Sequence, residues 1–387
     1  MKIISIIFTL TTLLSFSDIA AAEKSYSYRL DSGGDSEISP FMLSYNRVEG
    51  IFLGAGVPKE FRDYYGMESR LTFYGFYGYG LSNDESRYRG GLTRKFFGRN
   101  GIELGVESFN LTQSDDQWII PKDENSLAAF FFHQDFHDFY RNNGSSVYAI
   151  KNFGYNFNIE GGYRQEEHEN MRVEKDWSLF RKGRQFRDNP LVDEGIYNNT
   201  YLTLSLGNQR RDRGMSLRIE AEWNSSLFED DMPNYERYIA TFSRKQQLSR
   251  DDALNFRIRY GTSNGALPIQ KKFDLGGIGT MRGYRYKEFR NGDKMALVNF
   301  EYTTRGDVIS GLEFMPILDD FNISFFADAG VIWTGAEDLP KTSDFNRSVG
   351  IGISSEDDGF RIDFAKPLDG PESERDVIVS LRINRMF

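Results

Sequence analysis

Apolar and charged residues alternate one by one over many stretches of this 387-residue chain. In residues 216–223, Leu217, Ile219, Ala221 and Trp223 alternate with Ser216, Arg218, Glu220 and Glu222. In residues 254–260, Leu254, Phe256, Ile258 and Tyr260 alternate with Asn255, Arg257 and Arg259. Successive side chains of a β-strand point to opposite faces, so the pattern predicts strands with one apolar and one charged face. A soluble sandwich buries the apolar face, whereas an outer-membrane barrel turns it toward lipid and lines a wet lumen with the charged face.

Sixteen such segments follow one another, each about 10 to 14 residues long, which is enough to cross a bilayer at a tilt. They are 42–57, 67–81, 85–97, 100–113, 126–138, 144–152, 155–168, 196–208, 213–226, 235–248, 252–263, 294–306, 321–333, 345–355, 358–366 and 375–387. Bacterial single-chain barrels have an even number of antiparallel strands. The sequence therefore predicts an all-β fold, in which residues 42–387 form a single 16-stranded antiparallel transmembrane β-barrel.

The connections between these segments fall into two lengths. Short turns are expected at 82–84, 209–212, 249–251 and 356–357, and longer polar loops at 169–195, 264–293, 334–344 and 367–374. Short periplasmic turns and long external loops are typical of these barrels. Two connections that the count assigns to the short side, 114–125 and 307–320, are longer than this rule predicts.

The first 22 residues predict export. Lys2 precedes an apolar run at 3–16, and residues 20–22 are alanines that suit cleavage. The run is short for a membrane-spanning helix, so a signal peptide over 1–22 is favoured over an anchor. Residues 23–41 would then be a short polar N-terminal segment, and the protein an integral, multi-pass barrel in the outer membrane of a Gram-negative cell. The chain has no cysteine to form a disulfide, and its net charge of −10 argues against a nucleic-acid partner.

The end of the chain favours a closed barrel. No later stretch approaches the ~20 apolar residues of a spanning helix, and within a bilayer only helices and closed barrels pair every backbone N–H and C=O. In the last segment, Val377, Val379, Leu381, Ile383 and Phe387 share one face. This aromatic-ended strand resembles the signal read by outer-membrane assembly machinery, carried here by Leu381, Ile383 and Phe387. We expect it to lie across the closure from the strand that begins near Phe41.

Three motifs, in order, carry a resemblance to a known family. The loop before the predicted twelfth strand contains Met281-Arg282-Gly283-Tyr284. The next two strands contain Asn299-Phe300-Glu301-Tyr302 and Phe326-Ala327-Asp328-Ala329-Gly330. These segments resemble the [IVL]-Arg-Gly-[FY] loop tetrad, the strand-twelve motif and the Phe-x-Asp-x-Gly strand-thirteen motif of the BamA/TamA-type outer-membrane superfamily, also called the bacterial surface antigen family.

The resemblance implies that the long loop folds back into the lumen and that Arg282 pairs with Asp328, with Glu301 close by. Residue parity agrees, because Phe326, Asp328 and Gly330 share the face opposite the apolar one. A charge facing lipid at mid-membrane costs up to a few kcal/mol, so both acids should face the lumen. The alternative is that Arg282 and Asp328 are ordinary lumen charges with other partners.

Family members that insert or translocate proteins normally carry POTRA domains before the barrel, and the sequence leaves no room for one. It therefore best resembles a barrel-only branch. The resemblance implies a barrel that assists insertion or translocation of outer-membrane proteins, or remodels lipid, through the seam between its first and last strands. The partners would be outer-membrane lipid, client outer-membrane proteins or a separate periplasmic protein. The alternatives are a passive channel or surface antigen, and an accessory barrel for a separately encoded partner.

Two patterns mimic catalytic or metal sites. Residues 261–265 fit Gly-x-Ser-x-Gly, but that nucleophile elbow requires a strand–turn–helix context, and here it ends an alternating strand. His133, Asp135 and His137 would share the lumen face of predicted strand 126–138. Such a set suits several divalent ions, yet a polar lumen stripe is the simpler interpretation. We therefore expect no enzyme activity, no cofactor and no metal.

Overall fold

A computed structural model describes residues 38–59, 71–96, 101–154, 156–180, 183, 185–209, 214–224, 234–305, 321–335, 340–355, 359–371 and 376–383. Sixteen strands form one antiparallel sheet in chain order, and β12 and β13 form a separate hairpin. The strands are β1 (Met42–Asn46), β2 (Gly50–Val57), β3 (Leu71–Gly80), β4 (Glu85–Phe96), β5 (Ile102–Gln113), β6 (Tyr140–Phe153), β7 (Phe157–Asn170), β8 (Gly195–Gln209), β9 (Gly214–Asn224), β10 (Tyr235–Gln247), β11 (Asp252–Gly265), β12 (Phe273–Leu275), β13 (Phe289–Gly292), β14 (Lys294–Arg305), β15 (Phe321–Trp333), β16 (Asn346–Ser355), β17 (Arg361–Pro367) and β18 (Ile378–Arg382). The helices are α2 (Lys122–Phe132) and the 3₁₀ turns η3 (Ile269–Lys271) and η5 (Thr342–Asp344).

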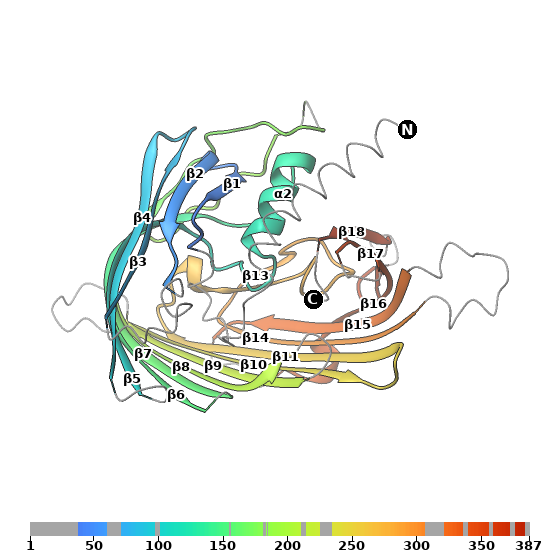
Figure 1. The fold of residues 1–387 in the computed structure, drawn as a ribbon. Coiled ribbons are helices and arrows are strands. Elements are labelled where there is room, and N and C mark those ends of the chain that lie inside the picture. Colours follow the sequence, from blue (N-terminus) through green and yellow to red (C-terminus); the bar gives the residue numbers. More distant parts are fainter. Residues whose placement is uncertain are drawn as a thin grey trace.

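The sheet curls so that its two ends, β1 and β18, come round toward each other, with α2 between them (Figure 1). The predicted 16-stranded antiparallel architecture is confirmed. Within the described part of the chain, no ladder of paired residues joins β1 to β18. No helix in that part is long and apolar enough to cross a membrane.

One predicted strand, 42–57, is in fact a tight hairpin. The Asn46 side-chain oxygen accepts hydrogen bonds from the backbone N–H groups of Val48 (3.0 Å) and Glu49 (2.7 Å). Gly50 follows with a φ of +64°, which a residue with a side chain rarely adopts. This Asn-initiated turn divides the segment into β1 and β2.

A second predicted strand, 126–138, is wrong because residues 122–132 form helix α2. Its sequence, KDENSLAAFFF, contains no β-branched residue and includes the helix formers Lys, Glu, Leu and two Ala. Pro121 precedes the helix and Asp123 and Glu124 occupy its first turn, which suits the positive end of the helix dipole. The hairpin adds one strand to the predicted number and the helix removes one, so the total remains sixteen. Strand β6 begins at Tyr140, earlier than the predicted 144–152.

These two corrections change which end of the barrel each early connection occupies. The connection 114–139, which contains α2, lies at the same end as the long loop 266–293, because an even number of strands separates them. This connection therefore lies at the end of the barrel where long loops are expected, and its length agrees with that expectation. The short turn at 82–84 also belongs to this end, contrary to the prediction. The connection 307–320 lies outside the described residues.

The outer face carries an apolar belt. Phe325, Ile351, Phe364 and Val379 lie in register across four neighbouring strands, and each is exposed. Large exposed apolar surfaces mark contact with membrane or partners, and this belt matches the lipid-facing band of an outer-membrane barrel. Leu381 also faces outward in β18, and Ile383 directly follows that strand. Phe387 and the predicted signal peptide 1–22 lie outside the described residues, as does most of the segment 23–41.

Candidate functional site

The long loop between β11 and β14 folds onto the inner side of the sheet. Its base is the hairpin β12–β13, which contacts β14 and β15. Beyond β12, Gly276, Gly277 and Gly279 adopt φ values of +118°, +82° and +79°, so the backbone turns sharply without side-chain strain. The Gly277 N–H then donates to the Met281 carbonyl at 2.9 Å. These turns bring residues 281–284 against the barrel wall.

Arg282 meets two carboxylates of the wall. Its Nε donates to Asp328 Oδ2 at 2.9 Å, its Nη2 to Asp328 Oδ1 at 2.7 Å and its Nη1 to Glu301 Oε2 at 2.7 Å. Its backbone N–H also reaches Asp328 Oδ2 at 3.0 Å. All three residues are at most 2% exposed. The structure therefore brings together the loop arginine and the two acids singled out from the sequence.

A second arginine completes this buried cluster. Arg361 of β17 donates to both oxygens of Glu301, at 2.7 and 2.8 Å, and to Asp363 Oδ1 at 2.7 Å. Glu301 thus lies between two guanidinium groups. Bidentate arginine–carboxylate contacts are stronger than neutral hydrogen bonds and fix the geometry of both partners. The cluster therefore joins the loop to β14, β15 and β17.

A polar pair extends the cluster under the loop backbone. Asn299 donates to the Thr280 carbonyl at 2.6 Å and to Asp328 Oδ1 at 2.8 Å. Arg257 of β11 donates to Asn299 Oδ1 and, at 2.5 Å, to the Gly279 carbonyl. The three cations, Arg257, Arg282 and Arg361, are matched by the three acids Asp328, Glu301 and Asp363. This match in number favours burial, because an unpaired buried charge is costly.

Each residue of the Phe-x-Asp-x-Gly motif has its own contact with the loop. The Arg282 guanidinium carbon lies 3.5 Å from the centroid of the Phe326 ring, a cation–π contact. Asp328 accepts the arginine hydrogen bonds. A Cβ at Gly330 would lie 2.8 Å from the Met281 sulfur, so glycine leaves room for that side chain. Because Phe326, Asp328 and Gly330 are every second residue of β15, all three face the loop and contact Arg282 or Met281.

The remaining members of the loop tetrad approach the wall closely. Met281 is fully buried in an apolar cluster with Leu275, Met295 and Leu297. The Gly283 N–H donates to Ser348 Oγ at 3.2 Å, and Tyr284 Oη donates to the Arg347 carbonyl at 3.1 Å. The tetrad thus touches β15 and β16 through side chains and backbone alike.

The charges beside Arg282 determine its protonation. Burial lowers the pKa of the Arg282 guanidinium, but Asp328 and Glu301 outweigh burial and the net shift is upward. Arg282 therefore stays charged. Removing one partner of such a buried pair costs about 3–5 kcal/mol, because the other charge is left without compensation.

A second buried cation ties the loop to the connection that holds α2. Lys287 Nζ lies 2.7 Å from Asp116, 2.6 Å from Asp138 and 3.3 Å from Asp274. Asp138 also contacts Arg187. Burial lowers the pKa of Lys287, yet the carboxylates raise it overall. Burial raises the pKa of Asp138, but Lys287 and Arg187 lower it to about 2.

We expect Lys287→Met to destabilise the protein by about 3 kcal/mol, because it leaves three carboxylates around an apolar side chain. The raised pKa of Lys287 means that its contribution persists below its unfolded pKa of ~10.4 and is lost as pH rises through the folded value. The lowered pKa of Asp138 means that its contribution persists above ~3.9 and is lost as pH falls toward about 2. Limited proteolysis of the loop should therefore be constant between about pH 5 and pH 9 in the parent and faster in the variant throughout. Equal cleavage of the two proteins would contradict this role.

The residues that mimic a catalytic or metal site have other contacts. Ser263 Oγ donates to the Asp293 carbonyl at 2.8 Å. His133 ends α2 and bonds Asp176 and Ser178, whereas Asp135 pairs with Arg47. His137 Nε2 bonds the Ile120 carbonyl at 2.8 Å. The expectation that His133, Asp135 and His137 share a strand face is wrong, because the chain there is a helix end and an irregular segment. Among the described residues, no group of three potential metal ligands converges.

The fold and this loop define a transmembrane β-barrel with an inward-folded loop held by a buried arginine. The family model described as the Omp85 superfamily domain matches residues 80–387, so the chain belongs to the Omp85 superfamily. The BamA/TamA-type resemblance inferred from the three motifs is thereby confirmed.

Two relatives illustrate the similarity. The outer membrane protein assembly factor BamA of Nitratidesulfovibrio vulgaris is 26% identical over 147 residues, which are 34% of this chain and 17% of that protein. The crystal structure of BamA from Haemophilus ducreyi lacking POTRA domains 1–3 superposes with a TM-score of 0.56 at 15% identity. That superposition covers 89% of this chain and 69% of the other, and it supports the barrel fold.

The sequence motifs did not include Arg361, Asp363 and Arg257, and Asn299 stood in the strand-twelve motif without an assigned contact. Asn299 and Arg257 lie on the predicted lumen faces of β14 and β11, and Arg361 and Asp363 alternate with apolar residues in β17. Parity therefore gave their face. It could not give their partners, because Arg361 and Glu301 are 60 residues apart in the chain.

Proposed function

We propose that the protein assists the insertion or translocation of outer-membrane proteins, or remodels outer-membrane lipid, through the seam between β1 and β18. The observation that supports this most is the contrast between the seam and the opposite wall. The strands at the two ends of the sheet are short, with five paired residues between β1 and β2 and five between β17 and β18. In the opposite wall, half-way round the sheet, β8 and β9 share eleven pairs.

Short strands with few hydrogen bonds separate more readily than long ones. A seam of this kind beside an apolar belt would also disturb the bilayer locally and lower the barrier to insertion. The buried cluster around Arg282 joins β14, β15 and β17, and β17 pairs with β18, so the cluster would keep the wall next to β18 rigid while the seam moves. Family membership adds support, because the relative found by sequence is named an outer membrane protein assembly factor.

Proteoliposomes provide the test. We expect vesicles that contain the purified barrel to accelerate the folding of a urea-denatured outer-membrane β-barrel, or the flipping of a fluorescent lipid, relative to empty vesicles. Vesicles that contain an unrelated porin at equal protein density are the control. If the barrel changes neither rate, the proposed function is wrong.

A passive channel or surface antigen is the alternative, and conductance distinguishes it. The inward loop and its buried charges occupy the lumen, so we expect low conductance that rises when Arg282 is replaced. A large, steady conductance that ignores this substitution would favour the channel. Co-purification with a periplasmic protein would favour an accessory barrel. We propose no enzymatic step.

A further inference from the structure

Helix α2 contacts the strands at both ends of the sheet. It packs against β1 (Figure 1) and accepts hydrogen bonds from Arg382, the last residue of β18, and from Ile383 directly after it. The helix belongs to the β5–β6 connection, so neither contact follows from chain continuity. Edge strands expose backbone groups that must be covered or paired. In this protein, α2 supplies partners to both edges.

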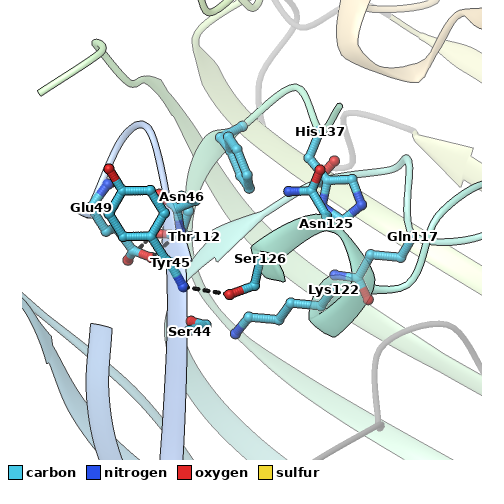
Figure 2. Close-up of a pocket in the computed structure, with 12 residues that line it drawn as sticks. Ser44, Tyr45, Asn46, Glu49, Thr112, Gln117, Lys122, Asn125, Ser126 and His137 are labelled. Carbon is cyan, nitrogen blue, oxygen red and sulfur yellow. Dashed lines mark hydrogen bonds between the residues drawn. The ribbon is translucent and has the colours of Figure 1, made fainter. Parts of the chain in front are cut away.

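On the β1 side the contacts are numerous. Ser126 Oγ accepts the backbone N–H of Tyr45 at 2.6 Å, as Figure 2 shows. The Tyr45 ring meets Phe130 of the helix edge-on at 5.5 Å and Trp177 of the next loop at 6.3 Å. Just beyond the helix, buried Asp135 pairs with Arg47 of the β1–β2 turn at 3.1 Å. The helix is therefore tied to β1 by a hydrogen bond, an aromatic cluster and a buried ion pair.

On the β18 side, one carboxylate of the helix accepts the hydrogen bonds from the described residues. Glu124 accepts the backbone N–H of Ile383 at 3.1 Å and two hydrogen bonds from Arg382, each at 3.2 Å. Arg382 is 2% exposed and Glu124 is 7% exposed. The three bonds are long for charge-assisted contacts, whose usual length is about 2.7–2.9 Å.

We propose that α2 is a latch across the seam, which stays attached to β1 and releases β18 when the bonds of Glu124 break. The contrast between the two sides carries the inference. Separation on the β1 side requires disruption of Ser126, the aromatic cluster and the Arg47–Asp135 pair together. Among the described residues, the hydrogen bonds between the helix and the β18 side all end on one side chain, that of Glu124. The latch rests on the proposed function in one respect, which is that the seam between β1 and β18 opens during activity.

Hydrogen exchange tests the latch without any client. Glu124→Gln keeps the volume of the side chain but removes the charge opposite Arg382. We expect backbone exchange at 376–383 to accelerate by roughly tenfold, since hydrogen bonds to charged groups are the stronger ones. Exchange at 42–46 should stay within about threefold of the parent rate, which corresponds to under 1 kcal/mol.

Two further variants serve as controls. Ser126→Ala removes one of several ties to β1 and should change exchange at 42–46 only slightly. Glu169 of β7 forms a partly exposed ion pair with Arg141. Glu169→Gln removes the negative charge of this pair and should change the exchange rate of neither segment. Unchanged exchange at 376–383 in Glu124→Gln would overturn the latch. Equal acceleration at 42–46 and 376–383 would overturn its asymmetry.

A cross-link then connects the latch with transport. The chain has no cysteine, so Glu124→Cys with Arg382→Cys can be bridged by a bifunctional thiol reagent. We expect bridging to abolish whichever proteoliposome activity the parent shows, and a reducible bridge to restore it on reduction. The control is Asp251→Cys with Arg305→Cys, an ion pair distant from the seam. Full activity of the bridged protein would overturn the need for release. An inactive parent would instead reject the proposed function, while the exchange result would still decide the latch.

Discussion

Replacing Arg282 by methionine should lower the free energy of unfolding by about 3–5 kcal/mol. The guanidinium makes three side-chain hydrogen bonds to Asp328 and Glu301, which are buried and have no access to water. Methionine leaves Asp328 with only the Asn299 side chain and a backbone N–H as donors. Glu301 retains Arg361, so the loss should arise mainly at Asp328. Urea-induced unfolding in micelles, followed by tryptophan fluorescence, measures the change.

The matched control is Arg305→Met. Arg305 forms a partly exposed pair with Asp251 at 3.8 Å, and exposed pairs contribute about 0–1 kcal/mol. A double-mutant cycle with Asp328→Asn should give a coupling of at least 1 kcal/mol between positions 282 and 328, because residues in one buried network are not additive. Equal destabilisation by Arg282→Met and Arg305→Met would contradict the account of this cluster.

Replacing Gly283 by alanine should displace the loop from the wall. A Cβ at this position would lie 2.5 Å from the Ser348 Cβ, 2.8 Å from the Lys366 carbonyl carbon and 2.9 Å from the Pro367 nitrogen. Two of these neighbours are backbone atoms of β17, which cannot move aside without disturbing the sheet. Overpacking of this kind costs about 1–3 kcal/mol. We expect faster protease cleavage within 266–293 and an unfolding midpoint at lower urea.

Gly90→Ala is the control for Gly283→Ala. Gly90 lies in β4 of the barrel wall, and a Cβ there would meet no atom within 4 Å. It should leave the protease pattern and the unfolding midpoint close to those of the parent. If Gly283→Ala behaves like Gly90→Ala, the loop does not approach the wall as the structure has it.

The parts of this fold that depend on local patterns were predictable. Alternation gave the faces of the strands, and the spacing of two in the Phe-x-Asp-x-Gly motif gave the lumen side for Phe326, Asp328 and Gly330. The parts that depend on distant contacts were not. Arg361 and Glu301 are 60 residues apart, and Arg382 and Glu124 are 258 apart. No local period connects such positions.

The two errors in strand assignment have separate physical causes. In 126–138, Phe130, Phe132 and Phe136 have the parity opposite to that of the polar set 133, 135 and 137, as in a strand. The preceding Pro121 and the acidic first turn nevertheless favour a helix. In 42–57 the turn is the mostly polar stretch 46–50, and its signal is Asn46 followed by Gly50. Both errors occur beside the seam, where a short hairpin and a helix replace two long strands.

The central claim is that the loop carrying Arg282 is folded against the inner wall of the barrel. Thiol labelling in intact outer membranes tests it directly, because the chain has no cysteine of its own. Met281 is fully buried, whereas Arg285 is exposed. The account predicts that a maleimide labels the Arg285→Cys variant rapidly and the Met281→Cys variant slowly, and that adding Asp328→Asn accelerates labelling at position 281. Equally rapid labelling of the two single variants would contradict it.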